Sequence, residues 1–309
     1  MTVSIVGAAG YTGGMLLRLL ARHPHVDSNG IAAISASHAG QAVNVVHTDI
    51  VSTNLTFADH VPNRSDVIFL CMDHGKSTQW MKENDVGEAL VIDLGQDHRG
   101  HADWVYGLPE FSRENLKHAK RIANPGCFAT CIELSLLPLI ESGDVEHVIV
   151  NATTGSTGAG QAPSPTTHYS WRANNLSVYK AFVHQHLEEI SMVLGMKPTL
   201  IPLRGSFPRG ILATSVTTTT HEVGSVHALY KEQYAGHPFV HVVDDLPDVK
   251  RAVGTNNCFI GIEEHEGSLL IVGVIDNLLK GASGQAVQNM NIACGFDESA
   301  GLHLMGVGY

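Results

Sequence analysis

The sequence predicts an α/β protein of two domains, the first with a doubly wound parallel sheet and the second with a mostly antiparallel sheet in an α+β arrangement. A length of 309 residues favours two domains, and 44% apolar residues suffice for two cores. Up to residue 123, short apolar runs alternate with helical segments, as in a parallel sheet. Beyond residue 140 the runs are longer, alternate more regularly and are separated by few helices, as in an antiparallel sheet.

The first strand, expected at residues 2–6, leads through a glycine-rich turn into a helix expected at residues 14–22. The turn reads Gly7-Ala8-Ala9-Gly10-Tyr11-Thr12-Gly13, a GxxGxxG spacing rather than GxGxxG. Glycines at this place let backbone N–H groups approach a pyrophosphate at the helix N-terminus. The sequence therefore predicts a dinucleotide site formed by Gly7, Ala9, Gly10, Tyr11, Thr12 and Gly13.

The second strand, expected at residues 30–35, ends in Ser35-Ala36-Ser37-His38. An NAD-specific site usually carries an acidic residue there for the ribose hydroxyls, and that charge would repel a 2′-phosphate. Its absence beside the hydroxyls of Ser35 and Ser37 favours NADP as the cofactor, although no arginine lies at this point. The alternative is a plain serine-rich turn.

The remaining strands and helices are predicted from the same kind of apolar pattern. Parallel strands are expected at residues 66–72, 89–94 and 120–123, followed by a helix at 127–140. Strands of the second sheet are expected at 146–153, 199–203, 211–219, 239–243, 258–263 and 268–275, and a last helix at 282–294 is expected to return to the first domain. We therefore expect an NADP-binding domain of residues 1–126 with 281–309, and a catalytic and oligomerisation domain of residues 127–280.

Composition excludes several classes of protein. The formal charge of −11 opposes nucleic-acid binding, and no apolar run approaches the roughly 20 residues that span a bilayer. The five cysteines are odd in number and lack CxxC spacing, so we expect neither a disulfide framework nor a structural zinc site. Without a basic-then-apolar leader, a cytoplasmic enzyme is expected.

Cys127 lies in Asn124-Pro125-Gly126-Cys127-Phe128-Ala129-Thr130, after an apolar run and at the head of the predicted helix. The unpaired N–H groups and the positive dipole end of a helix lower the pKa of a thiol there and favour the thiolate as a nucleophile. The alternative is a small buried side chain at a helix start, since free cysteines are often buried.

Six motifs in order resemble the N-acetyl-gamma-glutamyl-phosphate reductase family over essentially the whole chain. They are the glycine turn of residues 7–13, Tyr106-Gly107-Leu108-Pro109-Glu110, the Asn124–Thr130 segment, Gly155-Ser156-Thr157-Gly158-Ala159-Gly160, Pro208-Arg209-Gly210-Ile211 and Lys280-Gly281-Ala282-Ser283-Gly284-Gln285-Ala286. The resemblance implies a Rossmann domain plus a catalytic domain like that of glyceraldehyde-3-phosphate dehydrogenase. It also implies a homo-oligomer, a dimer or a tetramer.

The implied reaction belongs to arginine biosynthesis. NADPH reduces N-acetyl-L-glutamyl 5-phosphate to N-acetyl-L-glutamate 5-semialdehyde and phosphate, through a thioester on Cys127. The partner is thus a small-molecule acyl phosphate. N–H groups at the start of the Cys127 helix are expected to stabilise the oxyanions.

The resemblance places the catalytic histidine in the segment Val183-His184-Gln185-His186, and the sequence leaves His184 and His186 as alternatives. Either would serve as an acid and base near neutral pH. No metal is expected, because hydride transfer to a thioester needs none and no third ligand lies near the pair.

Anionic groups of a substrate are well bound by arginine, whose planar guanidinium donates two hydrogen bonds to a carboxylate or phosphate. Arg204 and Arg209 flank a Pro/Gly-rich turn between two expected strands. Residues 155–160 are expected to form an anion-binding nest of backbone N–H groups with the hydroxyls of Ser156 and Thr157. Asn124 belongs to the expected substrate site through its motif. Arg204 departs from the commoner family pattern, so an N-succinyl substrate is an alternative to N-acetyl.

Two other functions compete. Aspartate-semialdehyde dehydrogenase performs the same chemistry on the same architecture, and the motif set above argues against it. A non-enzymatic NADP sensor would leave Cys127, the histidine pair and Arg209 without a role.

Overall fold

The computed structural model describes residues 1–51, 54–62, 64–143, 145–218 and 222–306. The chain divides into two compact units. The first unit comprises Met1–Gly126 and Ala282–His303, and the second comprises Cys127–Gly281 and the described residues from Leu304 on. Gly281 and the last described residues thus group with the second unit, whereas the sequence had assigned residues 281–309 to the first.

The first unit contains a seven-stranded sheet in the order β3-β2-β1-β4-β5-β7-β6, with every pair of neighbours parallel. Its strands are β1 (Val3–Val6), β2 (Ile31–Ile34), β3 (Phe57–Ala58), β4 (Val67–Leu70), β5 (Leu90–Asp93), β6 (Val105–Tyr106) and β7 (Arg121–Ala123). The prediction of a doubly wound parallel sheet is confirmed. The chain order reverses beside β1, and ligands of such sheets bind at the carboxyl end of the strand where this happens.

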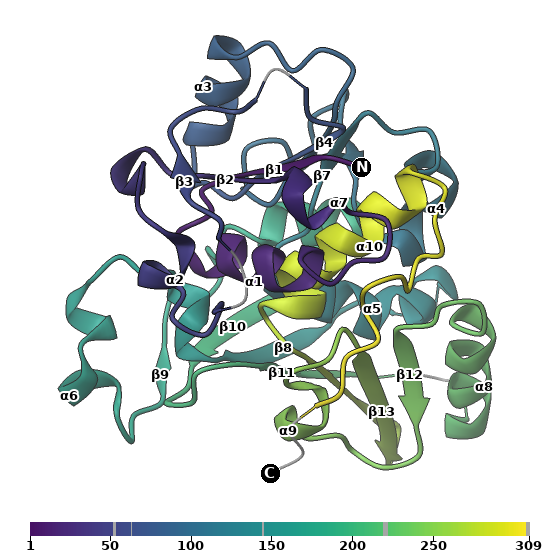
Figure 1. The fold of residues 1–309 in the computed structure, drawn as a ribbon. Coiled ribbons are helices and arrows are strands. Elements are labelled where there is room, and N and C mark those ends of the chain that lie inside the picture. The colour runs from purple at the N-terminus through teal and green to yellow at the C-terminus, as the bar shows by residue number, and fades with distance from the viewer. Residues whose placement is uncertain (52–53, 63, 144, 219–221, 307–309) are drawn as a thin grey trace. The chain divides into compact units, whose positions relative to one another are not determined.

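The helices of the first unit are α1 (Tyr11–Leu20), α2 (Val43–Val46), α3 (Lys76–Glu83), α4 (Pro109–Leu116) and α10 (Gly284–Ala293), with short 3-10 turns at Ser28–Gly30 and Ala36–His38. Helix α1 begins three residues earlier than the expected residue 14, because Gly10 already caps it. Helix α10 returns from the end of the chain and packs against α1 and α4, as Figure 1 shows in purple, blue and yellow.

The second unit contains a mixed seven-stranded sheet in the order β12-β13-β14-β11-β8-β10-β9. Its strands are β8 (Ile149–Thr154), β9 (Ser177–Val178), β10 (Thr199–Arg204), β11 (Ile211–Thr218), β12 (Val240–Val243), β13 (Cys258–His265) and β14 (Ser268–Ile275). Only the β8–β10 and β12–β13 pairs are parallel, so the prediction of a mostly antiparallel sheet is confirmed. Residue 219, the expected end of one strand, lies outside the described residues.

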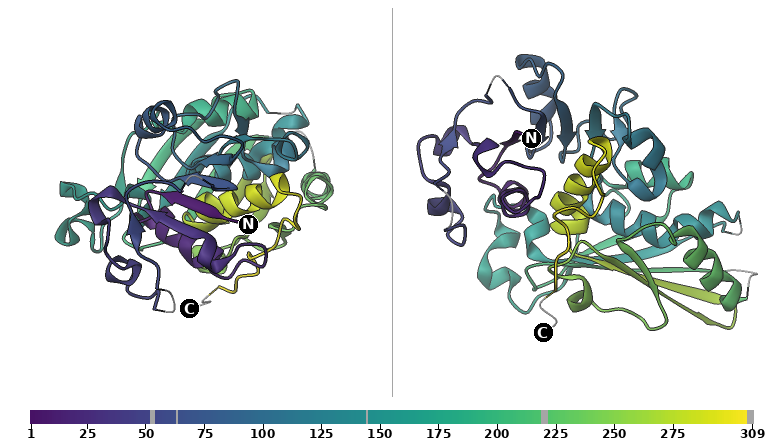
Figure 2. Two further views of the ribbon diagram at one scale, coloured as in Figure 1. Left: turned by 45° about the horizontal axis from the view of Figure 1, so that its top comes forward. Right: turned by 45° about the vertical axis from the view of Figure 1, so that its right-hand side comes forward.

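Helix α5 (Cys127–Glu141) packs on one face of this sheet together with α7 (Leu187–Leu194) and α8 (Val223–Gln233), and the right-hand view of Figure 2 shows the sheet edge-on. Gly273 of β14 permits the close approach, because a Cβ there would collide with the Ser135 hydroxyl of α5. On the other face α9 (Val249–Ala252) covers Val272 and Val274. Two 3-10 turns (Ser156–Ala159, Pro165–Thr167), α6 (Tyr169–Arg172) and a π turn at Leu279–Ser283 complete the element order. Among the described helices, none has the length and apolar character that a bilayer crossing requires.

Candidate active site

Cys127 is the first residue of α5, directly after the loop that leaves β7. The first N–H groups of a helix have no partners within it, and they favour an anion at this point. Cys127 is partly exposed, whereas Cys131, one turn later, is buried and burial raises the pKa of its thiol. A Cβ on Gly281 would lie 2.9 Å from the Cβ of Cys127, so glycine is needed beside the sulfur-bearing residue. The structure therefore offers Cys127 rather than Cys131 for chemistry.

His184 and His186 lie together beside Phe128, the residue that follows Cys127. Their ring centroids are 4.7 Å apart, and both rings stand edge-on to Phe128 at 5.3 Å and 6.2 Å. Both are buried, with 4% and 9% of their surface exposed. The chain turns at these residues before α7 begins.

The two histidines differ in their hydrogen bonds. The backbone N–H of His186 donates to Nδ1 of His184 at 3.2 Å, which leaves the proton of neutral His184 on Nε2. Burial, aided by the neighbouring His186 and Lys180, lowers the pKa of His184 to about 3. The Nε2 of His186 lies 3.9 Å from a carboxylate oxygen of buried Glu189. Nδ1 of His184 is thus already used as an acceptor, whereas His186 takes part in that bond through its backbone and not through its ring.

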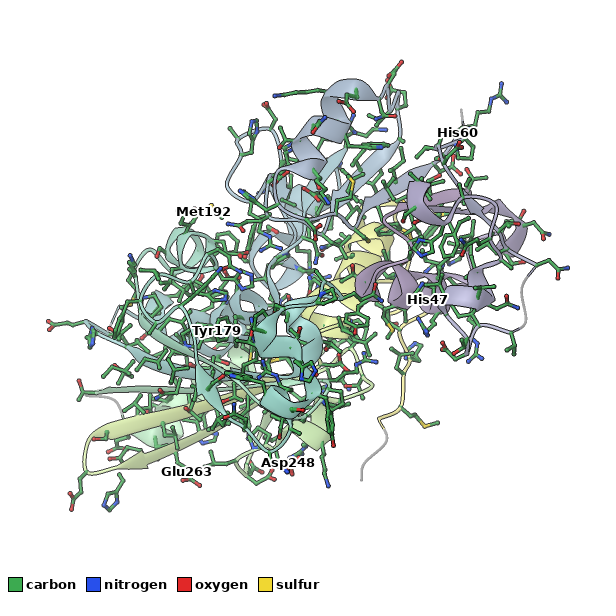
Figure 3. All side chains as sticks on the ribbon, turned by 90° about the vertical axis from the view of Figure 1, so that its left-hand side faces the viewer. His47, His60, Tyr179, Met192, Asp248 and Glu263 are labelled. Atoms are coloured by element: carbon green, nitrogen blue, oxygen red, sulfur yellow. The ribbon has the colours of Figure 1, made fainter. Side chains whose placement is uncertain are left out.

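Tyr179, labelled in Figure 3, links this cluster to two arginines. Its ring lies 5.6 Å from that of His184, and the guanidinium carbon of Arg204 lies 4.2 Å from its centroid. The pKa of Tyr179 is raised, first by burial and also by Cys127, while Arg204 and Arg172 act to lower it. The arginine predicted at 204 thus lies in the same cluster as Cys127 and His184.

Arg172 was missed by the sequence analysis. It is 6% exposed at the end of α6, and its Nη1 donates to the carbonyl of Arg204 at 3.3 Å. No local sequence motif identifies Arg172, because its contact with Arg204 depends on the chain folding back over about thirty residues. Strained backbone also gathers here, since Asn174, Lys180 and Phe182 have positive φ angles. Such strain is concentrated at functional segments.

Arg209 is oriented by a buried carboxylate. Its Nη2 and Nε donate to Asp276 Oδ1 at 2.9 Å and 3.3 Å, and Asp276 is fully buried. Nη1 makes no hydrogen bond to another described residue. One edge of the guanidinium is thus fixed and the other is left to bind a ligand.

The expected anion nest at residues 155–160 is not formed. The N–H groups of Gly155, Ser156 and Thr157 donate to carbonyls of Gly210, Phe207 and Pro208, and those of Gly158 and Gly160 donate within the loop. The N–H groups of residues 155–157 thus join the end of β8 to the turn that carries Arg209. The hydroxyl of Ser156 makes no hydrogen bond to another described residue, so Ser156 alone of this loop stays a candidate.

Asn124, which the sequence places in the substrate site, is buried and hydrogen-bonded within the protein in this structure. Asn124 is 1% exposed, its Nδ2 donates to the carbonyl of Ala282 at 3.2 Å, and its Oδ1 accepts from Asn289 at 3.0 Å. The Nε of Arg99 donates to its carbonyl at 3.0 Å. Both polar atoms of the amide are thus engaged, and Asn124 fixes the loop that precedes Cys127.

The glycine turn at the end of β1 has the geometry of a phosphate cradle. Gly7 has a φ of +85°, and a Cβ on Gly7 or Gly13 would collide with backbone of the turn or of Cys71. Gly10 caps α1, and its N–H donates to the carbonyl of Gly7 at 3.1 Å. In contrast, the N–H groups of Ala9, Tyr11, Thr12 and Gly13 make no hydrogen bond to another described residue. These free donors at a helix N-terminus fit a dinucleotide pyrophosphate.

Ser35 and Ser37 follow β2 and gather around His38, which the sequence analysis had not assigned. Their hydroxyls lie 3.1 Å and 2.9 Å from Nδ1 of His38. Two hydroxyls and an imidazole form a polar group that suits a phosphate and carries no acidic side chain of its own. His38 is thus the third member of the expected 2′-phosphate site.

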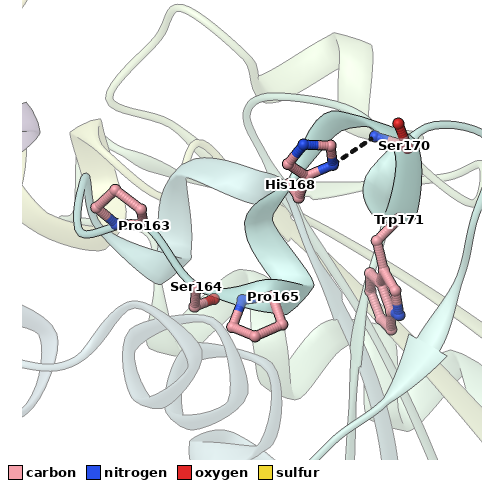
Figure 4. Close-up of a pocket in the computed structure, with 6 residues that line it drawn as sticks. All are labelled: Pro163, Ser164, Pro165, His168, Ser170 and Trp171. Atoms are coloured by element: carbon pink, nitrogen blue, oxygen red, sulfur yellow. Dashed lines mark hydrogen bonds between the residues drawn. The ribbon is translucent and has the colours of Figure 1, made fainter.

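A surface pocket lies on the segment that leads into Arg172, and Figure 4 shows it. The backbone N–H of Ser170 donates there to Nδ1 of His168 at 3.3 Å. None of its lining residues belongs to the cluster described above; they are Pro163, Ser164, Pro165, His168, Ser170 and Trp171.

Both units match known domain families. Residues 2–119 match the family described as semialdehyde dehydrogenase, NAD binding domain, and residues 127–277 match semialdehyde dehydrogenase, dimerisation domain. The boundary between the two matches falls in the segment that precedes Cys127.

Curated relatives are similar over nearly the whole chain. Proteins named N-acetyl-gamma-glutamyl-phosphate reductase from Phocaeicola vulgatus and Bacteroides fragilis are 47% identical over 314 residues, with 97% of each chain covered. The protein of that name from Flavobacterium johnsoniae is 43% identical over 326 residues, with 100% of both chains covered.

Solved structures share the fold at low identity. Aspartate semialdehyde dehydrogenase II from Vibrio cholerae, in complex with ASA, has a TM-score of 0.77 and 17% identity, covering 95% of this chain and 98% of that one. Aspartate semialdehyde dehydrogenase from Candida albicans, solved with NADP, has a TM-score of 0.72 and 16% identity, covering 94% and 97%. At such identities the likeness concerns the fold alone.

Proposed function

The chain belongs to the semialdehyde dehydrogenase family, among the N-acetyl-gamma-glutamyl-phosphate reductases, and on that premise we propose that it reduces N-acetyl-L-glutamyl 5-phosphate with NADPH through a thioester on Cys127. The observation that carries this proposal is the position of Cys127 at the start of α5, beside the cluster of His184, His186, Tyr179 and Arg204. A partly exposed thiol at a helix N-terminus is suited to attack an acyl group.

In the first step the Cys127 sulfur attacks the acyl carbon, and the bond from that carbon to the phosphate oxygen breaks. Phosphate leaves with the bonding electron pair, and a thioester remains on Cys127. His186, whose Nε2 lies 3.9 Å from a carboxylate oxygen of Glu189, is the group proposed to take the thiol proton before the attack. The first N–H groups of α5 stabilise the oxyanion at the attacked carbonyl.

NADPH, when bound, supplies the hydride that reduces the thioester. The resulting oxyanion is again held by the N–H groups at the start of α5. Collapse of this oxyanion breaks the C–S bond, releases the aldehyde and returns the sulfur of Cys127 as a thiolate, which His186 protonates. His184 keeps its proton on Nε2 throughout and holds the turn through its bond to the N–H of His186.

Arg204 and Arg209 are the proposed substrate-binding cations. The hydroxyl of Ser156, from the 155–160 motif, is proposed as a further substrate-binding group. For the cofactor, the free N–H groups of Ala9, Tyr11, Thr12 and Gly13 support pyrophosphate binding, and Ser35, Ser37 and His38 support 2′-phosphate binding. We further propose that the enzyme is cytoplasmic and that its second unit joins copies into a dimer or tetramer.

A second candidate is the same reaction on an N-succinyl substrate. The observation that favours it is the pair of arginines 172 and 204, because one more carboxylate on the substrate would give this pair a partner. Aspartate-semialdehyde dehydrogenase activity has weaker support, since it rests on structures at 16–18% identity.

The experiment is the reverse reaction, NADP reduction by N-acetylglutamate 5-semialdehyde. We expect turnover that requires inorganic phosphate, because only phosphate can release the thioester as the acyl phosphate. Parallel assays with N-succinylglutamate semialdehyde and aspartate semialdehyde rank the three substrates by kcat/KM. Absence of phosphate-dependent turnover with all three contradicts the proposed function and leaves the NADP-sensor interpretation.

A further inference from the structure

We propose that Arg172 and Arg204 form one carboxylate-binding site for the substrate, and that Arg172 is a specificity-determining residue. The inference rests on the proposed function, because the carboxylate is one that an N-acylglutamyl substrate carries. No family motif quoted above includes Arg172.

Arg172 is held in place by backbone atoms rather than by an acidic side chain. Its Nη1 donates to the carbonyl of Arg204 at 3.3 Å and its Nη2 to the carbonyl of Thr166 at 2.6 Å. Its Nε is buried and makes no hydrogen bond to a described residue. Arg172 is 6% exposed, and its guanidinium donates only to neutral carbonyls, so no hydrogen-bond partner neutralises its positive charge.

Arg204 is in a similar state. Its Nε is also buried without a hydrogen-bond partner among the described residues, and its guanidinium stacks on the ring of Tyr179. Burial lowers the pKa of Arg172, and the charge of Arg204 adds to that effect. Two like charges brought together with unused donors are stabilised by one shared anion.

Arg209 differs from Arg172 and Arg204 because it has an acidic partner. Arg209 pairs with the buried carboxylate of Asp276, so its charge is balanced within the protein. Among the described residues no carboxylate forms an ion pair with Arg172 or Arg204. The missing acidic partner of these two arginines is therefore expected to come from a ligand.

The position of Tyr179 favours a carboxylate over the phosphoryl group. The charge of Cys127 acts to raise the pKa of Tyr179, whereas the charges of Arg204 and Arg172 act to lower it. The phosphoryl group is attached to the acyl carbon through one oxygen, and it stays beside the sulfur during attack. A carboxylate several bonds from the acyl carbon can instead reach past the tyrosine ring to the arginines.

The test measures equilibrium binding by calorimetry with three probes: N-acetylglutamate, N-succinylglutamate and inorganic phosphate. The proteins are the wild type, Arg172→Gln, Arg172→Lys, Arg204→Gln and the double variant Arg172→Gln/Arg204→Gln. Arg251→Gln is the matched control, because Arg251 is a more exposed arginine of the same unit that already pairs with Asp245. Thermal unfolding of each variant confirms folding.

We expect Arg172→Gln to weaken at least one N-acylglutamate by tenfold or more and Arg172→Lys to weaken it less, with phosphate affinity unchanged. The double variant should lose less than the sum of the single losses, because both arginines bind one group. A loss for both N-acylglutamates assigns the site to a carboxylate of the glutamyl part, and a loss for N-succinylglutamate alone assigns it to the distal carboxylate of the acyl group.

Unchanged binding of both N-acylglutamates in folded variants overturns the inference, as does a loss confined to phosphate. Arg204→Gln leaves the carbonyl that anchors Arg172 in place, so it tests the pair even if Arg172→Gln fails to fold. Failure of the wild type to bind either N-acylglutamate contradicts the proposed function itself, and with it this site.

Discussion

The backbone N–H of His186 donates to Nδ1 of His184 at 3.2 Å, and this bond distinguishes two histidines that the sequence could not separate. His184 is thereby fixed as a neutral imidazole whose acceptor nitrogen is already used. His186 keeps the carboxylate of Glu189 near its Nε2. The bond therefore supports the proposal that His186 is the acid and base and that His184 is a positioning residue.

Replacing His186 by Asn should cost about 10²–10⁴ in rate and remove one limb of the pH profile, because the proton acceptor for the Cys127 thiol is lost. His184→Asn should lower the rate less and keep the limb. Steady-state kinetics from pH 5 to 9 distinguish the two variants. A lost limb in His184→Asn with a retained limb in His186→Asn would reverse the assignment.

His184 should also make stability depend on pH. Its pKa is about 3 in the folded protein against about 6.5 for an ordinary histidine, so the unfolded chain binds this proton more tightly. Stability from this group is complete above pH 6.5 and is lost as the pH falls toward 3, by at most about 1.4 kcal/mol per pH unit. Denaturant unfolding at several pH values should show a shallower acid loss in His184→Gln than in the wild type. Parallel curves would show that His184 titrates normally.

Gly281→Ala should reduce turnover by about tenfold to a hundredfold, because the added Cβ would lie 2.9 Å from the Cβ of Cys127 and displace the sulfur. NADPH binding, measured by fluorescence, should be unchanged. Gly224→Ala in α8 is the control, since a Cβ there meets nothing within 4 Å. Equal rates for Gly281→Ala and Gly224→Ala would show that the position of Cys127 tolerates the methyl group.

Ser35→Asp should weaken 2′,5′-ADP binding by about 1–3 kcal/mol through charge repulsion while leaving 5′-AMP binding nearly unchanged. Ser28→Asp is the matched control, because Ser28 is an exposed serine at the opposite end of β2. Calorimetry with both nucleotides tests the prediction. If the two variants bind 2′,5′-ADP equally well, Ser35 does not face the 2′-phosphate.

The sequence predicted the two sheets well because buried strands and glycine turns are local patterns. The place of Cys127 at a helix start is equally local, since it depends on the few residues from Asn124 to Thr130. These features need no knowledge of which distant segments meet.

What the sequence could not predict depends on contacts across the chain. Arg172 matters because it folds back to the carbonyl of Arg204, thirty-two positions later. Asn124 looked like a ligand-binding residue, yet Asn289 of α10, 165 positions away, occupies its amide oxygen. The anion nest predicted at residues 155–160 does not form for the same reason, because the N–H groups of residues 155–157 donate to carbonyls of the turn at 207–210.

The covalent intermediate on Cys127 is the central claim, and intact-protein mass spectrometry tests it most directly. The enzyme is mixed with N-acetyl-L-glutamyl 5-phosphate without NADPH, so that the thioester accumulates. We predict a mass increase of one N-acetylglutamyl group, located on the peptide that contains Cys127, absent in Cys127→Ser and discharged when NADPH is added. A wild-type protein that remains unmodified yet turns over with NADPH, or an adduct on another cysteine, would contradict the account.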